Sequence, residues 1–181
     1  MRHSTLLEFL PFLAEIASGT LRDQVADVWH EAMRRGGWDP ALLWSIPLSL
    51  RVEVQSVPLV LHVRTVASLA TAAASTLEAH HSGLSIDRDV LLAGCALFDV
   101  GKLLEYAHTP GGVAHSAATR LRHPFIGTAL AYERRLPDAV LHCIAAHSWE
   151  GDKSNRSAEA LILRQVIPLA DLYSSSVYIA P

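Results

Sequence analysis

The run LAGCALFDVGKLLEY, residues 92–106, places an acid inside an apolar helical pattern. Asp99 falls on a face that is otherwise apolar, and Gly101 and Lys102 follow it directly. Burying a carboxylate is costly unless a metal ion or a charged partner satisfies it. The run therefore predicts a helix in the interior of the fold, with Asp99 directed at a partner that other segments supply.

Apolar residues recur at helical spacing along most of the chain. We expect helices over residues 6–13, 21–35, 58–80, 89–104, 124–134, 138–148 and 158–178. Residues 48–54 could form a short extended piece, and residues 105–121, with two glycines and a proline, are expected to form a loop. About six or seven helices and no convincing sheet predict an all-α fold, a single-domain helical bundle.

Composition limits the classes of protein to which the chain can belong. Its 181 residues, 50% of them hydrophobic, suit one domain, in which residues 1–56 form an N-terminal helical extension packed on a core of residues 57–181. A net charge of −3 gives no case for a nucleic-acid partner. Two cysteines build no disulfide framework, so a cytoplasmic location is expected. Pro11 and nearby acids interrupt the first apolar run, so no membrane span is expected there, whereas the apolar N-terminal layer slightly favours a homodimer.

Five polar residues interrupt apolar helices at helix ends or on buried faces, each on a different predicted helix: His62, Asp99, His123, His147 and Asp171. Any one of these histidines alone is more simply interpreted as a helix cap or a surface residue. The prediction of a metal site therefore depends on the five residues together. A helical bundle can build a metal site in its core from such side chains. Imidazole and carboxylate together suit a divalent transition metal, Fe, Mn, Ni, Co or Zn, as one or two ions.

The order of these landmarks resembles the HD-domain superfamily of metal-dependent phosphohydrolases. The similarity spans about residues 57–175 and rests on His62, Asp99-Val100-Gly101-Lys102, His123-Pro124-Phe125-Ile126-Gly127, His147-Ser148-Trp149-Glu150-Gly151 and Ala170-Asp171-Leu172. The resemblance implies that His62, Asp99 and Asp171 face one metal ion. It also implies that Asp99, His123 and His147 face a second ion, with Asp99 shared.

Phe98 departs from that family, because a metal-binding histidine is expected at its position. A phenyl ring has no lone pair, so the first metal position loses a ligand and the second loses none. Four explanations are open: one metal ion at the second position, two ions with water filling the gap, a relative that no longer catalyses, or a residue introduced by experiment to disable the site.

The resemblance implies hydrolysis of a nucleotide or another small phosphate ester. Asp99 and Lys102 would be catalytic, and Lys102, Arg122 and His115 would contact the substrate. Solvated loop residues are the ordinary alternative for Arg122 and His115. Two other functions stay open: a diiron oxygenase of the inositol-oxygenase type, and a non-catalytic ligand-binding domain.

Overall fold

A computed structural model describes residues 3–50 and 57–172 of the chain. Within those residues the protein is mainly helical, which confirms the all-α prediction. The helices are α1 (His3–Phe9), α2 (Gly19–Gly36), α3 (Leu59–His80), α4 (Arg88–Leu97), α5 (Lys102–Glu105), α6 (His123–Glu133), α7 (Asp138–Ala146) and α8 (Ala158–Ala170). Three short 3₁₀ helices, Pro11–Glu15, Pro40–Ser45 and Trp149–Gly151, lie between them.

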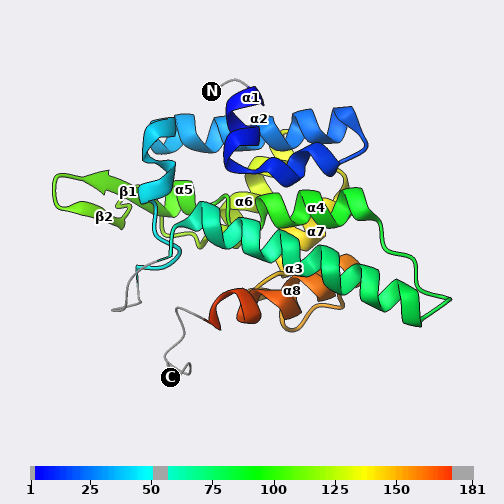
Figure 1. The fold of residues 1–181 in the computed structure, drawn as a ribbon. Coiled ribbons are helices and arrows are strands. Elements are labelled where there is room, and N and C mark those ends of the chain that lie inside the picture. The colour runs from blue at the N-terminus through cyan, green and yellow to red at the C-terminus, as the bar shows by residue number, and fades with distance from the viewer. Residues whose placement is uncertain (1–2, 51–56, 173–181) are drawn as a thin grey trace, which may run out of the picture.

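Helix α4 is the centre of the fold. It lies between the layer of α1 and α2 on one side and α3 and α8 on the other, and it contacts α2, α3, α7 and α8 (Figure 1). Every residue from Val90 to Leu97 is buried, because the helix is apolar on all sides and is surrounded by other helices. Asp87 caps its start by accepting a hydrogen bond from the backbone N–H of Val90 at 3.0 Å.

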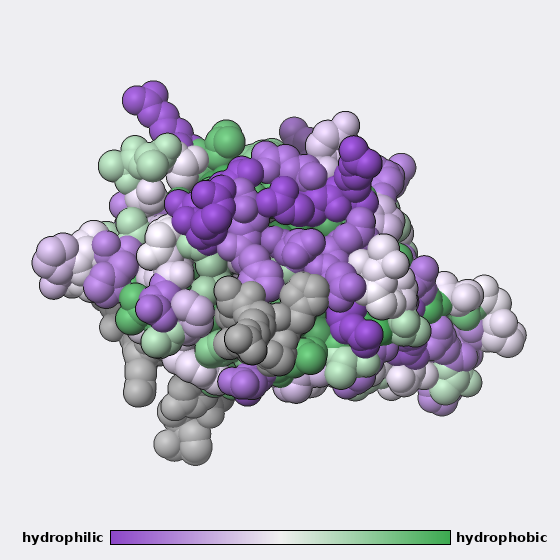
Figure 2. Space-filling view, turned by 90° about the horizontal axis from the view of Figure 1, so that it is seen from above, coloured by the Kyte–Doolittle hydropathy of each residue, from purple (hydrophilic) through white to green (hydrophobic). Residues whose placement is uncertain are grey.

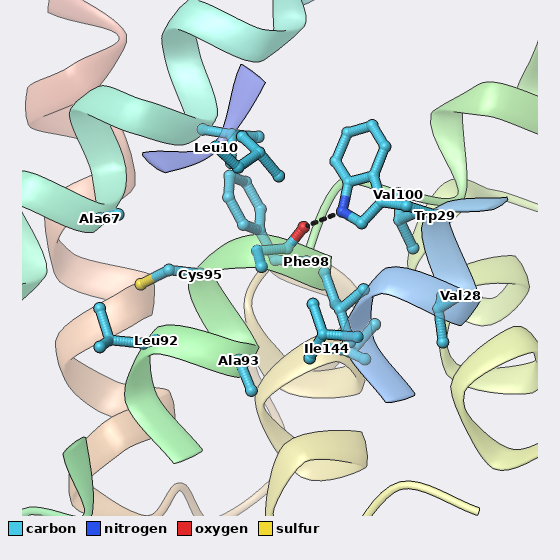
Figure 3. Packing of buried hydrophobic residues seen from close by; sticks show 14 of the residues in the cluster. Leu10, Val28, Trp29, Ala67, Leu92, Ala93, Cys95, Phe98, Val100 and Ile144 are labelled. Carbon is cyan, nitrogen blue, oxygen red and sulfur yellow. Dashed lines mark hydrogen bonds between the residues drawn. The ribbon is translucent and has the colours of Figure 1, made fainter. Parts of the chain in front are cut away.

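The N-terminal layer shares one apolar core with the rest of the described chain. The indole of Trp29 on α2 donates a 2.9 Å hydrogen bond to the backbone oxygen of Ala96 on α4, and Phe98 lies in the same buried cluster (Figure 3). Figure 2 looks onto the layer from outside and shows hydrophilic side chains over much of it. Helix α2 is thus amphipathic, with its apolar stripe turned to α4.

Two predictions about the segment after residue 88 are wrong. The helix expected over 89–104 ends at Leu97, and a turn over residues 98–101 separates it from the short α5. The loop expected over 105–121 contains an antiparallel hairpin of β1 (Tyr106–Thr109) and β2 (Gly112–His115). Gly112, the first residue of β2, takes a positive φ of 107°, which a glycine adopts without strain. Residues 51–54 of the expected extended piece lie outside the described residues. The helix expected over 158–178 ends at Ala170, and residues 173–178 lie outside the described residues.

Among the described helices, α3 alone has the length and apolar composition to cross a membrane. A core helix of a globular protein passes the same test, and 44% of the most apolar window of α3 is buried inside the fold. The composition of α3 is therefore only a weak indication of a membrane span.

Candidate metal centre

The turn after α4 places Asp99 at the middle of the candidate site. Asp99 is 2% exposed, and its two carboxylate oxygens face different neighbours. Oδ1 lies 3.2 Å from Nε2 of His123 and 3.9 Å from Nε2 of His147. Oδ2 lies 2.8 Å from Nζ of Lys102 and 3.9 Å from Nε2 of His62. One buried carboxylate thus joins four polar residues from four parts of the chain.

Asp99, His123 and His147 form a buried cluster that could hold a metal ion. Each offers one ligand atom, and these atoms all lie within 4.8 Å of one another. In the described part of the chain this is the one group of three or more such residues that meets this spacing. The prediction of a cluster that could bind a metal ion is therefore supported.

His123 is held by Glu105, a residue that the sequence analysis did not single out. The Glu105 carboxylate accepts hydrogen bonds from the backbone N–H of His123 at 2.9 Å and from its Nδ1 at 2.8 Å. Burial raises the pKa of Glu105, but hydrogen bonds from the side chain and backbone of His123 and the nearby charge of Arg122 lower it, so the net pKa is below its usual value and the group is ionised. Carboxylates that accept from the outer nitrogen of a histidine are frequent behind metal-binding histidines. The sequence signal that could have pointed to Glu105 is its position, since it is a charged residue directly after the apolar pair Leu103–Leu104.

His147 is oriented by its own helix. It follows the last turn of α7, and its Nδ1 donates a 2.7 Å hydrogen bond to the backbone oxygen of Ile144. Because a carbonyl oxygen only accepts, Nδ1 carries the proton and Nε2 keeps a lone pair. Burial lowers the pKa of His147 to about 4, so the imidazole is neutral near pH 7.

The donor chemistry of the cluster fits a cation. In the neutral tautomers set by Glu105 and the Ile144 carbonyl, Nε2 of both histidines is an acceptor, and both atoms face the acceptor Oδ1 of Asp99. Acceptors directed at one another in a buried site require a proton or a metal ion between them. One carboxylate oxygen and two imidazole nitrogens form a ligand set that suits Fe, Mn, Co, Ni or Zn.

His62 and Asp171 meet on the other side of Asp99. His62 lies in the first turns of α3, and its Nδ1 is 3.2 Å from Oδ1 of Asp171, which follows α8. Burial lowers the pKa of His62 to about 4 and raises the pKa of Asp171 to about 6, and the nearby charge of Asp99 adds to the shift of Asp171.

The structure brings all five predicted ligand residues together around one cavity, and Phe98 lies between two of them. Its ring centroid is 5.6 Å from that of His62 and 5.2 Å from that of His147.

The five residues open onto one cavity of about 420 Å³. Its lining combines the cluster with two cationic side chains and several apolar ones: Leu48, His62, Phe98, Asp99, Lys102, His123, His147, Ser148, Trp149, Arg164, Ile167, Pro168 and Asp171. Trp149 is 67% exposed, so much of its indole faces solvent. The cavity is large enough for a small ligand that carries an anionic group.

Of the three predicted substrate contacts, one lines the cavity and two do not. Lys102 lines the cavity, whereas Arg122 and His115 are not among the residues that line it. Arg122 lies between two acids instead, with Nε 3.4 Å from Glu105 and 3.7 Å from Glu150. His115 lies in β2, opposite Tyr106 in the hairpin.

Arg164 is the cavity residue that the sequence analysis missed. Its guanidinium contacts both carboxylate oxygens of Asp152, at 3.2 Å from Nε and 3.5 Å from Nη2, and Asp152 also accepts from Arg156 at 2.8 Å. Arg164 is the one charged residue between positions 160 and 170, seven residues before Asp171. Seven residues are about two helical turns, so Asp171, which directly follows α8, lies on the same side of that helix as Arg164. That spacing was the available sequence signal.

Comparisons of the chain with protein-family models, with curated proteins and with solved structures find no match.

Proposed function

We propose that the protein is a metal-dependent phosphohydrolase of the HD-domain type, acting on a nucleotide or another small phosphate ester. The observation that carries the proposal is the buried cluster of Asp99, His123 and His147 at a cavity that also presents Lys102 and Arg164. A metal-ligand set beside two cations suits an anionic ester, because the cations neutralise charge that builds up on a phosphoryl group.

Asp99, His123 and His147 would hold the metal ion, which we take to be Fe, Mn, Ni, Co or Zn. Such an ion supplies Lewis acidity toward a phosphoryl oxygen and makes water acidic enough to act as a nucleophile near neutral pH. Glu105 and the Ile144 carbonyl keep both imidazoles in the tautomer that ligates. The residues themselves therefore provide a preorganised site.

Lys102 and Arg164 would bind the phosphoryl oxygens. Two of the three N–H donors of the Lys102 amino group bond to Asp99 and to the Leu48 backbone oxygen, each at 2.8 Å. Among residues 3–50 and 57–172 no hydrogen bond uses the third, which would donate to a substrate oxygen. The contacts of Arg164 with Asp152 use Nε and Nη2, so within the described chain Nη1 remains a donor for the same phosphate. Asp152 thus positions the guanidinium of Arg164 without using all of its N–H donors.

Trp149 favours a substrate with a planar group. Its largely exposed indole lies on the cavity lining, and a nucleobase stacked on an aromatic ring gains about 1–3 kcal/mol. A nucleoside phosphate would place its base against Trp149 and its phosphate near Lys102 and Arg164. This reading makes nucleotides the first substrates to test.

The experiment is a phosphate-release assay on nucleotides and sugar phosphates, with Mn²⁺, Ni²⁺, Co²⁺, Fe²⁺ and Zn²⁺ supplied separately. We expect release with at least one ion, and its loss in His123→Ala and His147→Ala, whereas the exposed His81→Ala retains it. Arg164→Ala should raise KM, and Arg34→Ala on the outer face of α2 should leave KM unchanged. A panel without phosphate release for every ion would contradict the proposal.

A second candidate function, a non-catalytic ligand-binding domain, is favoured by Phe98. The ring fills a position where the HD-type resemblance implies a histidine. In that case nucleotides would bind the cavity, with Trp149→Ala lowering their affinity, and no phosphate would be released. Nucleotide binding measured beside phosphate release separates the two candidates.

A further inference from the structure

Arg122 lies between two acids behind the candidate metal centre. Its Nε is 3.4 Å from Oε1 of Glu105 and 3.7 Å from Oε1 of Glu150. The side chains of Glu105 and Glu150 are only 9% and 5% exposed, whereas that of Arg122 is 33% exposed. Buried carboxylates are costly unless a cation compensates them, and the guanidinium supplies that positive charge to both.

Each of the two acids is tied to a different histidine of the metal-binding cluster. Oε2 of Glu105 accepts hydrogen bonds from the backbone N–H and from Nδ1 of His123. Oε2 of Glu150 accepts a hydrogen bond from the hydroxyl of Ser148, the residue that directly follows His147. The two carboxylates therefore connect one guanidinium to both histidines.

Both ends of this connection are anchored in the backbone. Arg122 directly precedes α6, and its backbone oxygen accepts a 3.1 Å hydrogen bond from the N–H of Phe125. The 3₁₀ helix that carries Glu150 packs directly against α7, since a Cβ at Gly151 would lie 2.5 Å from Cα of Ala146. A change of the Arg122 side chain is therefore transmitted to the first residue of α6 and to the residue that follows α7.

We infer that Arg122 is a positioning residue, which holds the two acids behind the metal-binding histidines and so strengthens metal binding, and that it does not contact the substrate. The inference rests on the proposed function, because it assumes that the cluster binds metal. Arg122 is not among the residues that line the cavity. Its contacts with the two acids are longer than good hydrogen bonds, so the positive charge of Arg122 carries the effect.

The test is a calorimetric titration of the protein and its Arg122 variants with Zn²⁺. We expect Arg122→Gln to lower the Zn²⁺ affinity about tenfold, the lower end of the loss caused by removing a partner behind a metal-binding histidine. Arg122→Lys should restore most of the affinity, because lysine keeps the charge. The exposed Arg120→Gln, two residues earlier, is the matched control. If Arg122→Gln does not fold, Arg122→Met, which keeps an unbranched apolar stem, takes its place.

Two further measurements separate positioning from a general structural role and from substrate binding. In a double-mutant cycle, Arg122→Gln should lower the Zn²⁺ affinity less in the Glu105→Gln background than in the unmodified protein, because the carboxylate through which it acts is gone. The affinity of the Zn²⁺-saturated protein for inorganic phosphate should be the same with and without Arg122→Gln.

Unchanged Zn²⁺ affinity in Arg122→Gln would overturn the inference and leave the proposed function standing. Arg122→Lys that binds as weakly as Arg122→Gln, or effects that simply add in the cycle, would also overturn it. Weaker phosphate binding with unchanged Zn²⁺ affinity would make Arg122 a substrate contact instead. Failure of the unmodified protein to bind Zn²⁺, Mn²⁺ or Co²⁺ would overturn the proposed metal-dependent function itself.

Discussion

Oδ1 of Asp99 lies 3.2 Å from Nε2 of His123, and in the neutral tautomer of His123 both atoms are hydrogen-bond acceptors. The contact is buried, and Glu105 on the far side of the ring fixes the proton on Nδ1. A cation between the two atoms converts a repulsive contact into an attractive one. This relationship links the fold to the proposed chemistry, and several measurable consequences depend on it.

Glu105→Gln should weaken metal binding without unfolding the protein. The amide can no longer act as a charged acceptor behind His123, and loss of such a partner lowers metal affinity by about 10- to 100-fold. Calorimetric titration with Zn²⁺ or Mn²⁺ measures the effect. The exposed Glu15→Gln is the matched control, and equal affinities of the two variants would contradict a role for Glu105.

Lys102→Met should destabilise the metal-free protein. Removing one partner of a buried ion pair leaves Asp99 uncompensated, which costs about 3–5 kcal/mol. Burial raises the pKa of Asp99, but the charge of Lys102 is the largest of the effects that oppose burial, and the net pKa lies well below its usual range, so the carboxylate is ionised. Urea denaturation measures the loss, and added metal should restore part of it. A variant as stable as the parent without metal would show that the ion pair contributes little.

Gly101→Ala should disturb the site through the backbone. A Cβ at position 101 would lie 2.2 Å from the backbone oxygen of His123 and 2.8 Å from the backbone nitrogen of Gly127, so the start of α6 would have to move. We expect a lower thermal midpoint and weaker metal binding, because His123 moves with that backbone. Gly83→Ala is the control, since a Cβ there meets nothing within 4 Å. If both variants behave alike, close packing is not the reason for glycine at position 101.

Acidification should destabilise the metal-free protein. Burial lowers the pKa of His62 and of His147 from 6.5 to about 4, so between these values the unfolded chain binds more protons than the folded one. The free energy of unfolding therefore falls as the pH drops from 6.5 to about 4. Asp171, whose pKa rises from 3.8 to about 6, contributes in the opposite direction over most of that range, but it is one group against two. Urea midpoints of metal-free protein at pH 7 and pH 4.5 check the sign, and a higher midpoint at pH 4.5 would contradict it.

Helix positions were the part of the fold most accessible from sequence. The apolar spacing after Pro58 predicted a helix to about His80, and α3 runs from Leu59 to His80. The hairpin was missed because its strands are four residues each and partly exposed, so they carry little apolar alternation. Its stability comes from pairing between strands, which helical periodicity does not report.

The candidate site was predictable in its ligands and less so in its surroundings. Acids and histidines that interrupt apolar helices pointed to Asp99 and His123, because burial of such groups demands partners. The roles of Glu105 and Arg164 depend on how α5 meets α6 and how α8 borders the cavity, and those are tertiary contacts. The ion pair of Lys102 with Asp99 likewise became visible only in the structure.

The most direct test of the account is a crystal structure of the protein grown with Co²⁺ or Zn²⁺, with anomalous diffraction recorded at the edge of that metal. The account predicts one strong anomalous peak within bonding distance of Oδ1 of Asp99 and Nε2 of His123 and His147. A main peak between His62 and Asp171, or no peak at these five residues, would contradict it.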